Sequence, residues 1–157
     1  MKGGMIYIGA DHAGFKFKKK LKRYFDSKSI KYVDLGGTGE KRDDYPDFAF
    51  KVAKKVLSDK DSRGILICGT GTGMVVAANK AKGIRAAVGY DKYSVVMGRH
   101  DNDINVLCLR GRKFSDTKNL KLVKLWLKTG FRGQARYERR LRKIQGFKKE
   151  NERWDEK

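Results

Sequence analysis

A single cysteine at the end of an apolar run is the residue of this sequence best placed to do chemistry. Residues 65–79 read I-L-I-C-G-T-G-T-G-M-V-V-A-A-N, so an apolar strand delivers Cys68 onto a glycine-threonine loop that opens a helix. Glycines let backbone amides turn inward, and a helix N-terminus adds partial positive charge. A thiol beside such amides can act as a thiolate base, so the pattern indicates proton chemistry on an anionic substrate.

The same loop allows a plainer interpretation. It has neither the G-x-G-x-x-G spacing of a dinucleotide site nor the G-K-[ST] ending of a P-loop, so both are excluded. Gly69, Gly71 and Gly73 could form a strand-to-helix turn without a ligand, and Cys68 could be a small core residue. Cys108 lies in an apolar run without such a loop and is expected to belong to the core.

Polar residues follow two other strand-like segments. Asp11 and His12 come directly after the first segment, and the second leads towards D-D-Y-P, which contains Tyr45. In a parallel sheet these positions meet Cys68 at the carboxyl edge, where ligands bind. Asp11 and His12 could grip a hydroxyl and a carbonyl or ring oxygen, or they could be surface residues that cap the following helix.

Alternating strand-like and helix-like segments predict an α/β fold, a Rossmann-like three-layer domain with a five-stranded parallel sheet and right-handed crossovers. The expected strands are 5–10, 31–35, 64–68, 85–89 and 105–109. The expected helices are 14–27, 46–57, 73–80, 92–100, 116–129 and 134–151. The last of these helices extends beyond the sheet.

The 157 residues, 39% of them hydrophobic, suit a single domain, which we place at 1–147 with a charged extension at 148–157. No apolar run approaches the roughly 18 residues of a membrane span, and the N-terminus reads as a strand. Two cysteines fit reduced thiols in a cytoplasmic protein, and two histidines argue against a structural zinc site.

The formal net charge of +20 raises the question of nucleic-acid binding. Basic residues concentrate in 16–31 and 110–157. In the first block, Phe17, Leu21 and Phe25 keep helical spacing, so the lysines are expected on the opposite, solvated face. The alternative is a surface for polyanions. Against it, aromatic residues do not alternate with the basic runs as stacking platforms would require.

Several short motifs together resemble the type B ribose-5-phosphate isomerases, a family that includes the galactose-6-phosphate isomerase subunits. They are G-A-D-H-A-G-F, D-Y-P, I-C-G-T-G-T-G with A-A-N-K, G-I-R-A, and N-D-I-N-V-L with a later G-R. The resemblance covers about residues 5–145. It implies an aldose-ketose isomerase of phosphorylated sugars that works through a cis-enediolate without a metal or organic cofactor.

The resemblance also implies roles for individual residues. Cys68 would take the proton, Thr70 would move protons on the substrate oxygens, and the amides of Gly69, Gly71 and Gly73 would hold the enediolate. Asp11, His12 and Tyr45 match sugar contacts, and Asn102 matches one supplied by a neighbouring subunit. The resemblance thus implies a dimer, which the C-terminal helix is expected to reach. Arg112, Arg136 and Arg140 match phosphate contacts, and the last two are spaced to share one helix face.

Two positions depart from the family pattern. Asp101 stands where the usual enzymes carry the histidine credited with opening the sugar ring, and His100 lies one place early, about 100° round a helix. An aspartate could accept the ring hydroxyl's proton but is a weaker base at neutral pH. Tyr137 replaces a histidine on the phosphate side, so it can donate a hydrogen bond but adds no charge.

The favoured function is therefore conversion of ribose 5-phosphate to ribulose 5-phosphate by a homodimer or a dimer of dimers with shared sites. A different phosphosugar or a role as one subunit of a hetero-oligomer remains open. The alternative from another class is a non-catalytic binder of polyanions or nucleic acid. No membrane partner is expected.

Overall fold

The computed structural model describes residues 4–37, 39 and 41–151, and side chains only as far as Phe147. The parallel sheet has the strand order β2-β1-β3-β5-β4. Its strands are β1 (Ile6–Ala10), β2 (Tyr32–Asp34), β3 (Arg63–Cys68), β4 (Ala86–Val88) and β5 (Val106–Arg110). The helices are α1 (Phe15–Ser27), α2 (Tyr45–Ser58), α3 (Thr72–Ala78), α4 (Lys92–Asn102), α5 (Asp116–Lys128) and α6 (Ala135–Asn151).

Two separate apolar clusters make this a three-layer fold, as predicted. On one face of the sheet, α1, α4 and α5 contribute to the cluster around Phe25, Leu107 and Trp126. On the other face, α2 and α3 pack through the cluster around Val52, Leu66 and Met74. The central strands β1 and β3 are buried almost throughout, whereas the edge strands β2 and β4 are mostly half-buried. Continuous apolar runs in the middle strands therefore reflect burial on both faces.

Local chain chemistry moves two helix ends away from the expected positions. Helix α3 begins at Thr72 because Gly71, at φ +80°, takes the left-handed conformation that ends the loop. Helix α4 continues to Asn102 because Asp103, at φ +46°, supplies the left-handed C-cap. The sequence prediction ended that helix two residues early. His100 and Asp101 are therefore both helical.

One lysine of α1 departs from the predicted solvated face. Lys18 is 1% exposed, and its ammonium group donates to Asp34 Oδ1 at 2.7 Å, the Gly36 carbonyl at 2.5 Å and the Gly37 carbonyl at 2.6 Å. The expectation for Lys18 was wrong because three acceptors at the end of β2 replace its lost hydration. The other basic side chains of α1 are exposed or half-buried, as expected.

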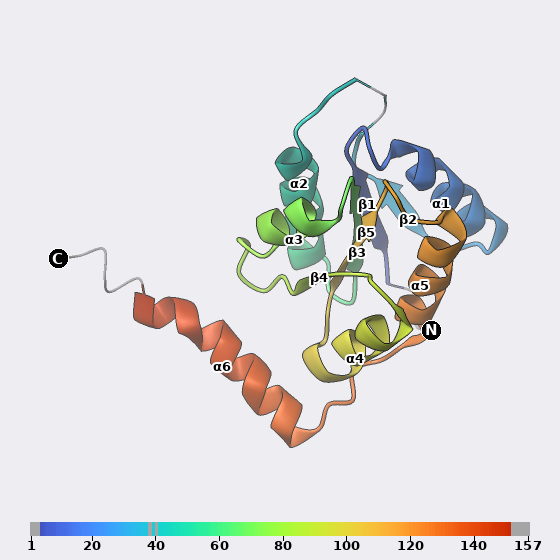
Figure 1. Ribbon diagram of the computed structural model, residues 1–157. Helices are drawn as coiled ribbons and strands as arrows, with labels where there is room; N and C mark the ends of the chain where they lie inside the picture. Colours follow the sequence, from blue (N-terminus) through green and yellow to red (C-terminus); the bar gives the residue numbers. More distant parts are fainter. Residues whose placement is uncertain (1–3, 38, 40, 152–157) are drawn as a thin grey trace.

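Helix α6 stands apart from the sheet and projects away from it (Figure 1). Its exposed apolar side chains include Ile144, 59% exposed, and Phe147, 63% exposed. The backbone of α6 continues through Asn151, while residues 152–157 of the expected extension lie outside the described part. No helix among the described residues is long and apolar enough to cross a bilayer.

Candidate active site

Cys68 ends β3 with its sulfur inside the loop that follows. The thiol is 4% exposed, and the Gly71 amide donates a hydrogen bond to Sγ at 3.2 Å. This contact requires the left-handed Gly71, where a side chain would be strained. An N–H donated to sulfur stabilises negative charge on it. Cys68 thus combines the burial of a core residue with the polar contact expected of a base.

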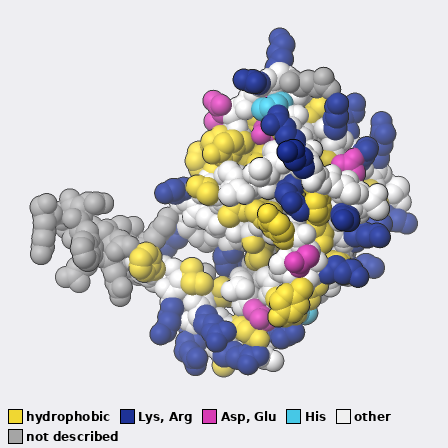
Figure 2. All heavy atoms as spheres, viewed as in Figure 1, with side chains coloured by type: hydrophobic (Ala, Val, Ile, Leu, Met, Phe, Trp, Pro, Cys, Tyr) yellow, Lys and Arg dark blue, Asp and Glu magenta, His cyan; other side chains and the backbone are white. Residues whose placement is uncertain are grey.

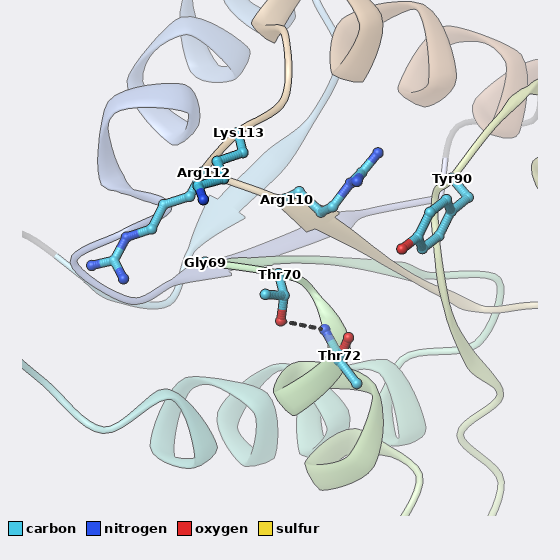
Figure 3. Close-up of a pocket in the computed structure, with 7 residues that line it drawn as sticks. All are labelled: Gly69, Thr70, Thr72, Tyr90, Arg110, Arg112 and Lys113. Atoms are coloured by element: carbon cyan, nitrogen blue, oxygen red, sulfur yellow. Dashed lines mark hydrogen bonds between the residues drawn. The ribbon is translucent and has the colours of Figure 1, made fainter.

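A pocket opens next to this loop. It has a volume of about 490 Å³ and is lined by Gly69, Thr70, Thr72, Tyr90, Arg110, Arg112 and Lys113 (Figure 3). Within the loop, the Thr72 amide donates to Thr70 Oγ1 at 3.3 Å. Three cations and no carboxylate line the pocket, so it suits an anionic ligand.

The β1–α1 loop places Asp11 and His12 at the same edge of the sheet. Asp11 is 6% exposed and accepts from the amides of Ala13 at 2.9 Å and Gly14 at 3.0 Å. Burial raises the pKa of its carboxyl group above the usual value, against the effect of these donors. Asp11 is thus buried rather than a surface residue, and its carboxylate accepts from amides of the loop before α1, whose N-cap Gly14 has no side-chain cap.

His12 is oriented from two sides. Asp43 Oδ1 accepts from the His12 backbone amide at 2.8 Å and lies 3.0 Å from ring Nδ1. On the other side of the ring, Arg112 Nη2 lies 3.4 Å from Nε2. Both ring nitrogens of His12 therefore have a partner, the Asp43 carboxylate at Nδ1 and the Arg112 guanidinium at Nε2.

Tyr45, the first residue of α2, packs on the loop through Gly73. A Cβ added at Gly73 would lie 2.8 Å from the Tyr45 ring, so only glycine permits this approach. The β5–α5 loop is tied to the cysteine loop in a similar way, because the Gly111 amide donates to the Cys68 carbonyl and the Arg112 amide to Gly69. The structure therefore brings Asp11, His12, Tyr45, Cys68, Thr70 and Arg112 to one edge.

The predicted residues of α4 lie at the opposite edge. Helix α4 runs antiparallel to the strands, and Asp103, just beyond its end, pairs with Arg85 at the start of β4. His100 directs Nδ1 to the Gly130 carbonyl at 3.0 Å, and Asp101 Oδ1 lies 3.6 Å from Arg132 Nη1. Asn102 is exposed. One chain thus does not bring Asp101 or Asn102 to Cys68 (Figure 1).

Arg136 and Arg140 lie on α6, and their guanidinium groups flank the ring of Tyr137 at 4.5 Å and 6.0 Å. Tyr137 is 4% exposed, and its hydroxyl oxygen accepts from Arg136 and Arg132. Both predicted arginines are exposed on α6, which projects away from the sheet, whereas Arg112 follows β5 (Figure 1). The three phosphate contacts implied by the resemblance therefore fall into two groups.

Sequence reasoning missed four charged residues at these places. Asp43 lay in a recognised loop, but nothing in the pattern paired it with His12. Arg132 lies between α5 and α6, where no motif marked it. Arg110 and Lys113 could have been found from their position, because they follow β5 at the edge where β3 delivers Cys68.

Other candidate chemistry is absent from the described residues. No three His, Cys, Asp or Glu side chains there are grouped to hold a metal ion. Cys108 is fully buried in the core, as predicted, and burial raises the pKa of its thiol well above the usual value. Cys68 is thus the only one of the two cysteines that adjoins a polar loop.

Known proteins resemble this chain in both sequence and fold. The Ribose/Galactose Isomerase model matches residues 6–144. The structure of ribose-5-phosphate isomerase B from Mycoplasma genitalium with bound ribulose-5-phosphate is 43% identical over 93% of this chain and 97% of that chain, with a TM-score of 0.87. That of Clostridium thermocellum ribose-5-phosphate isomerase B is 40% identical over 94% and 99%, with a TM-score of 0.89.

A further relative has a name that indicates a different substrate. D-erythrulose-4-phosphate isomerase 2 of Mycolicibacterium smegmatis is 39% identical over 83% of this chain and 88% of its own length. The family match spans residues 6–144, and the relatives are 39% or more identical over most of this chain and of their own length. The chain therefore belongs to the Ribose/Galactose Isomerase family.

Proposed function

We propose that the protein is an aldose-ketose isomerase of phosphorylated sugars with Cys68 as its base. The observation that carries the proposal is the Gly71 amide held 3.2 Å from Cys68 Sγ beside a pocket lined by three cations. The same strand, loop and helix belong to the region matched by the family model. The geometry supports removal of a proton from a substrate that is already anionic.

The proposed reaction needs two proton transfers at carbon. The Cys68 thiolate takes the proton from the carbon beside the carbonyl. The electron pair of the broken C–H bond forms the double bond of a cis-enediolate. Inward-facing amides of the 69–73 loop stabilise the negative oxygen, and Thr70 relays a proton between the two oxygens. Return of the proton from the Cys68 thiol to the adjacent carbon completes the isomerisation without net change in protons.

One end of the substrate carries the phosphate. We assign it to Arg112 and His12, which lie 3.4 Å apart through Nη2 and Nε2 at the mouth of the pocket. Arginine forks match phosphate oxygens in charge and geometry. Asp11 and Tyr45 are proposed as sugar contacts, since the Asp11 loop and the Tyr45 ring adjoin the same loop cluster.

A second copy of the chain would complete the site. Asp101, Asn102, Arg136 and Arg140 lie at the opposite edge or on α6, so a single chain cannot apply them to a substrate at Cys68. Asp101 Oδ1 has no hydrogen-bond partner among the described residues, although Arg132 Nη1 lies 3.6 Å away, so its carboxylate keeps the capacity to accept a proton from a ring hydroxyl. The exposed apolar residues of α6 provide a surface for the partner.

The substrate we favour is ribose 5-phosphate, because relatives with that name match nearly the whole chain. A relative named for a four-carbon ketose phosphate is nearly as similar, so the number of carbons in the sugar is the property of the substrate to be tested. A panel of aldose and ketose 4-, 5- and 6-phosphates incubated with purified protein tests the proposal. Conversion of the pentose phosphates supports it, and absence of conversion of every member contradicts it.

A further inference from the structure

The pocket beside Cys68 carries a guanidinium group towards each of its two ends. Arg112 directs its guanidinium to His12 on one side, and Arg110 extends in the other direction towards Tyr90 (Figure 3). The loop of Gly69, Thr70 and Thr72 lies between them. The Arg112 end is the one assigned above to the substrate phosphate, so the Arg110 end is not used by that function.

Arg110 is held in place by several contacts. It pairs with Cys68 across the β3–β5 ladder. Its backbone carbonyl accepts from the side-chain amide of the fully buried Asn119 at 2.7 Å. Its guanidinium carbon lies 3.8 Å from the centre of the Phe114 ring and 4.5 Å from that of Tyr90. Stacking between two rings fixes a planar guanidinium without using its N–H donors.

Those donors lack an acceptor. Arg110 Nε is buried without a hydrogen-bond partner, and no carboxylate of the described residues forms an ion pair with this side chain. The arginines at the opposite edge differ, because Asp103 pairs with both Arg85 and Arg99. The covered Nε cannot itself reach a ligand, but Arg110 lines the pocket and its charge has no carboxylate partner among the described residues, so the terminal N–H groups of its guanidinium are suited to a ligand acceptor.

We propose that Arg110 is a specificity-determining residue that binds a second phosphate, so that the pocket takes sugar bisphosphates as well as monophosphates. Lys113 lines the same pocket and adds positive charge for such a group. A volume of about 490 Å³ accommodates a five-carbon chain with a phosphate at each end. The proposal rests on the proposed function, since it takes Arg112 and His12 as the site of the first phosphate.

Equilibrium binding tests this role independently of catalysis. Ribitol 5-phosphate and ribitol 1,5-bisphosphate have no carbonyl group and cannot react, and they differ only in the second phosphate. Calorimetry would compare the full-length protein with Arg110→Met, which keeps the apolar stem between the rings, and with Arg110→Lys. Arg23→Met, on the exposed surface of α1, removes one charge elsewhere. Arg112→Met tests the first phosphate site separately.

We expect the native protein to bind the bisphosphate at least about tenfold more tightly than the monophosphate. Arg110→Met should weaken bisphosphate binding about tenfold and monophosphate binding less than about twofold, with Arg110→Lys between them. Equal affinity of the native protein for the two ligands would overturn the role of Arg110. So would equal losses for both ligands in Arg110→Met, or the same loss in Arg23→Met.

Arg112→Met separates the two proposals. If it abolishes binding of both ligands while Arg110→Met changes neither, the phosphate site of the proposed function stands and the second site is rejected. If Arg110→Met melts at a much lower temperature than the native protein, Arg110→Lys decides between the outcomes. The lysine keeps the positive charge but lacks the planar guanidinium. An unchanged preference of Arg110→Lys for the bisphosphate would therefore contradict recognition by the guanidinium.

Discussion

At the scale of single residues, the proposed phosphate site depends most on the His12 ring, which lies between Asp43 and Arg112. The carboxylate holds Nδ1 and leaves Nε2 towards the pocket. The residue types in this arrangement could be predicted from sequence because Asp11, His12 and Cys68 each follow a strand. Their pairing could not be, since Asp43 and His12 are 31 residues apart and only the folded loops bring them together.

Removing Asp43 should therefore weaken substrate binding more than it slows the chemical step. In Asp43→Ala the ring loses its partner at Nδ1, and we expect KM for the phosphosugar to rise about tenfold with a smaller change in kcat. Asp44→Ala is the matched control. Asp44 is the exposed neighbour of Asp43, and its loss is expected to leave KM and kcat unchanged. A fall in kcat with constant KM would assign Asp43 to the chemistry instead.

The two cysteines offer a paired test of the base. Cys68→Ala should lower kcat by a factor of about 10² to 10⁴ with ligand binding retained, which is the range for loss of a positioned base. Cys108→Ala removes the buried core thiol and should lower thermal stability while keeping activity. Steady-state assays with melting curves measure both. Retention of full activity by Cys68→Ala would reject its assignment as the base.

At the scale of elements, the C-terminal edge of the sheet is held by buried polar contacts that the sequence pattern did not reveal. Helical periodicity correctly predicted the buried Phe17, Leu21 and Phe25, yet Lys18, next to Phe17, is buried as well. Periodicity treats every lysine as solvated, so it cannot detect one whose three acceptors lie 16 to 19 residues away. The end of α4 was missed for a similar reason, because aspartate at a left-handed C-cap is less common than glycine.

The Lys18 contacts predict acid sensitivity that involves Asp34. Burial alone would raise the pKa of Asp34, but hydrogen bonds from Lys18, Lys22 and the Gly36 amide lower it. A lowered folded-state pKa contributes stability that is fully present above the unfolded value, near about 4, and is lost as the pH falls through the folded value.

Denaturant unfolding of the native protein and of Asp34→Asn measures this contribution. The difference in the free energy of unfolding should be constant above about pH 5 and should shrink as the pH falls from about 4 towards about 2. Lys18→Met, which breaks the buried pair, should cost about 2 kcal/mol at neutral pH. A difference between native and Asp34→Asn that does not change with pH would contradict the account.

At the scale of the whole molecule, the sheet could be predicted in outline and the assembly could not. Strand and helix order follow from periodicity, and the five-stranded parallel sheet is confirmed. Neither the strand order nor the separation of Arg112 from Arg136 and Arg140 follows from residue spacing. Sharing of the site between copies remains a proposal based on the family resemblance and on the opposite-edge positions of Asp101 and Asn102.

Mixing two inactive variants tests that sharing. One chain carries Cys68→Ala, and the other carries Arg136→Ala with Arg140→Ala. After unfolding and refolding at equal amounts, half of the dimers should be mixed, and each mixed dimer should have one intact site of two. About a quarter of native activity should then return. No recovery, with mixed dimers shown by mass spectrometry, would place the arginines and Cys68 in the same chain.

The net charge of +20 leaves polyanion binding as the competing function for the whole molecule. Figure 2 shows Lys and Arg side chains scattered over the visible face, among apolar and other side chains. We expect gel-shift titrations with RNA and DNA to show binding only at low salt, because dispersed lysines release counterions without specific contacts. Tight binding that persists at moderate salt, together with absence of isomerase activity, would favour the polyanion function.

The most direct test of the central claim is proton exchange at carbon. Purified protein is incubated in deuterated water with ribose 5-phosphate and with ribulose 5-phosphate, and NMR follows the carbon beside the carbonyl. An enediolate formed by Cys68 predicts deuterium at that carbon in the native protein and none above background in Cys68→Ala. A proton that is shielded from solvent on Cys68 would give interconversion without deuterium uptake. Transfer of a label from the substrate carbon to the adjacent carbon is therefore measured in parallel in a single turnover. Exchange or transfer that persists at the native rate in Cys68→Ala would contradict the account.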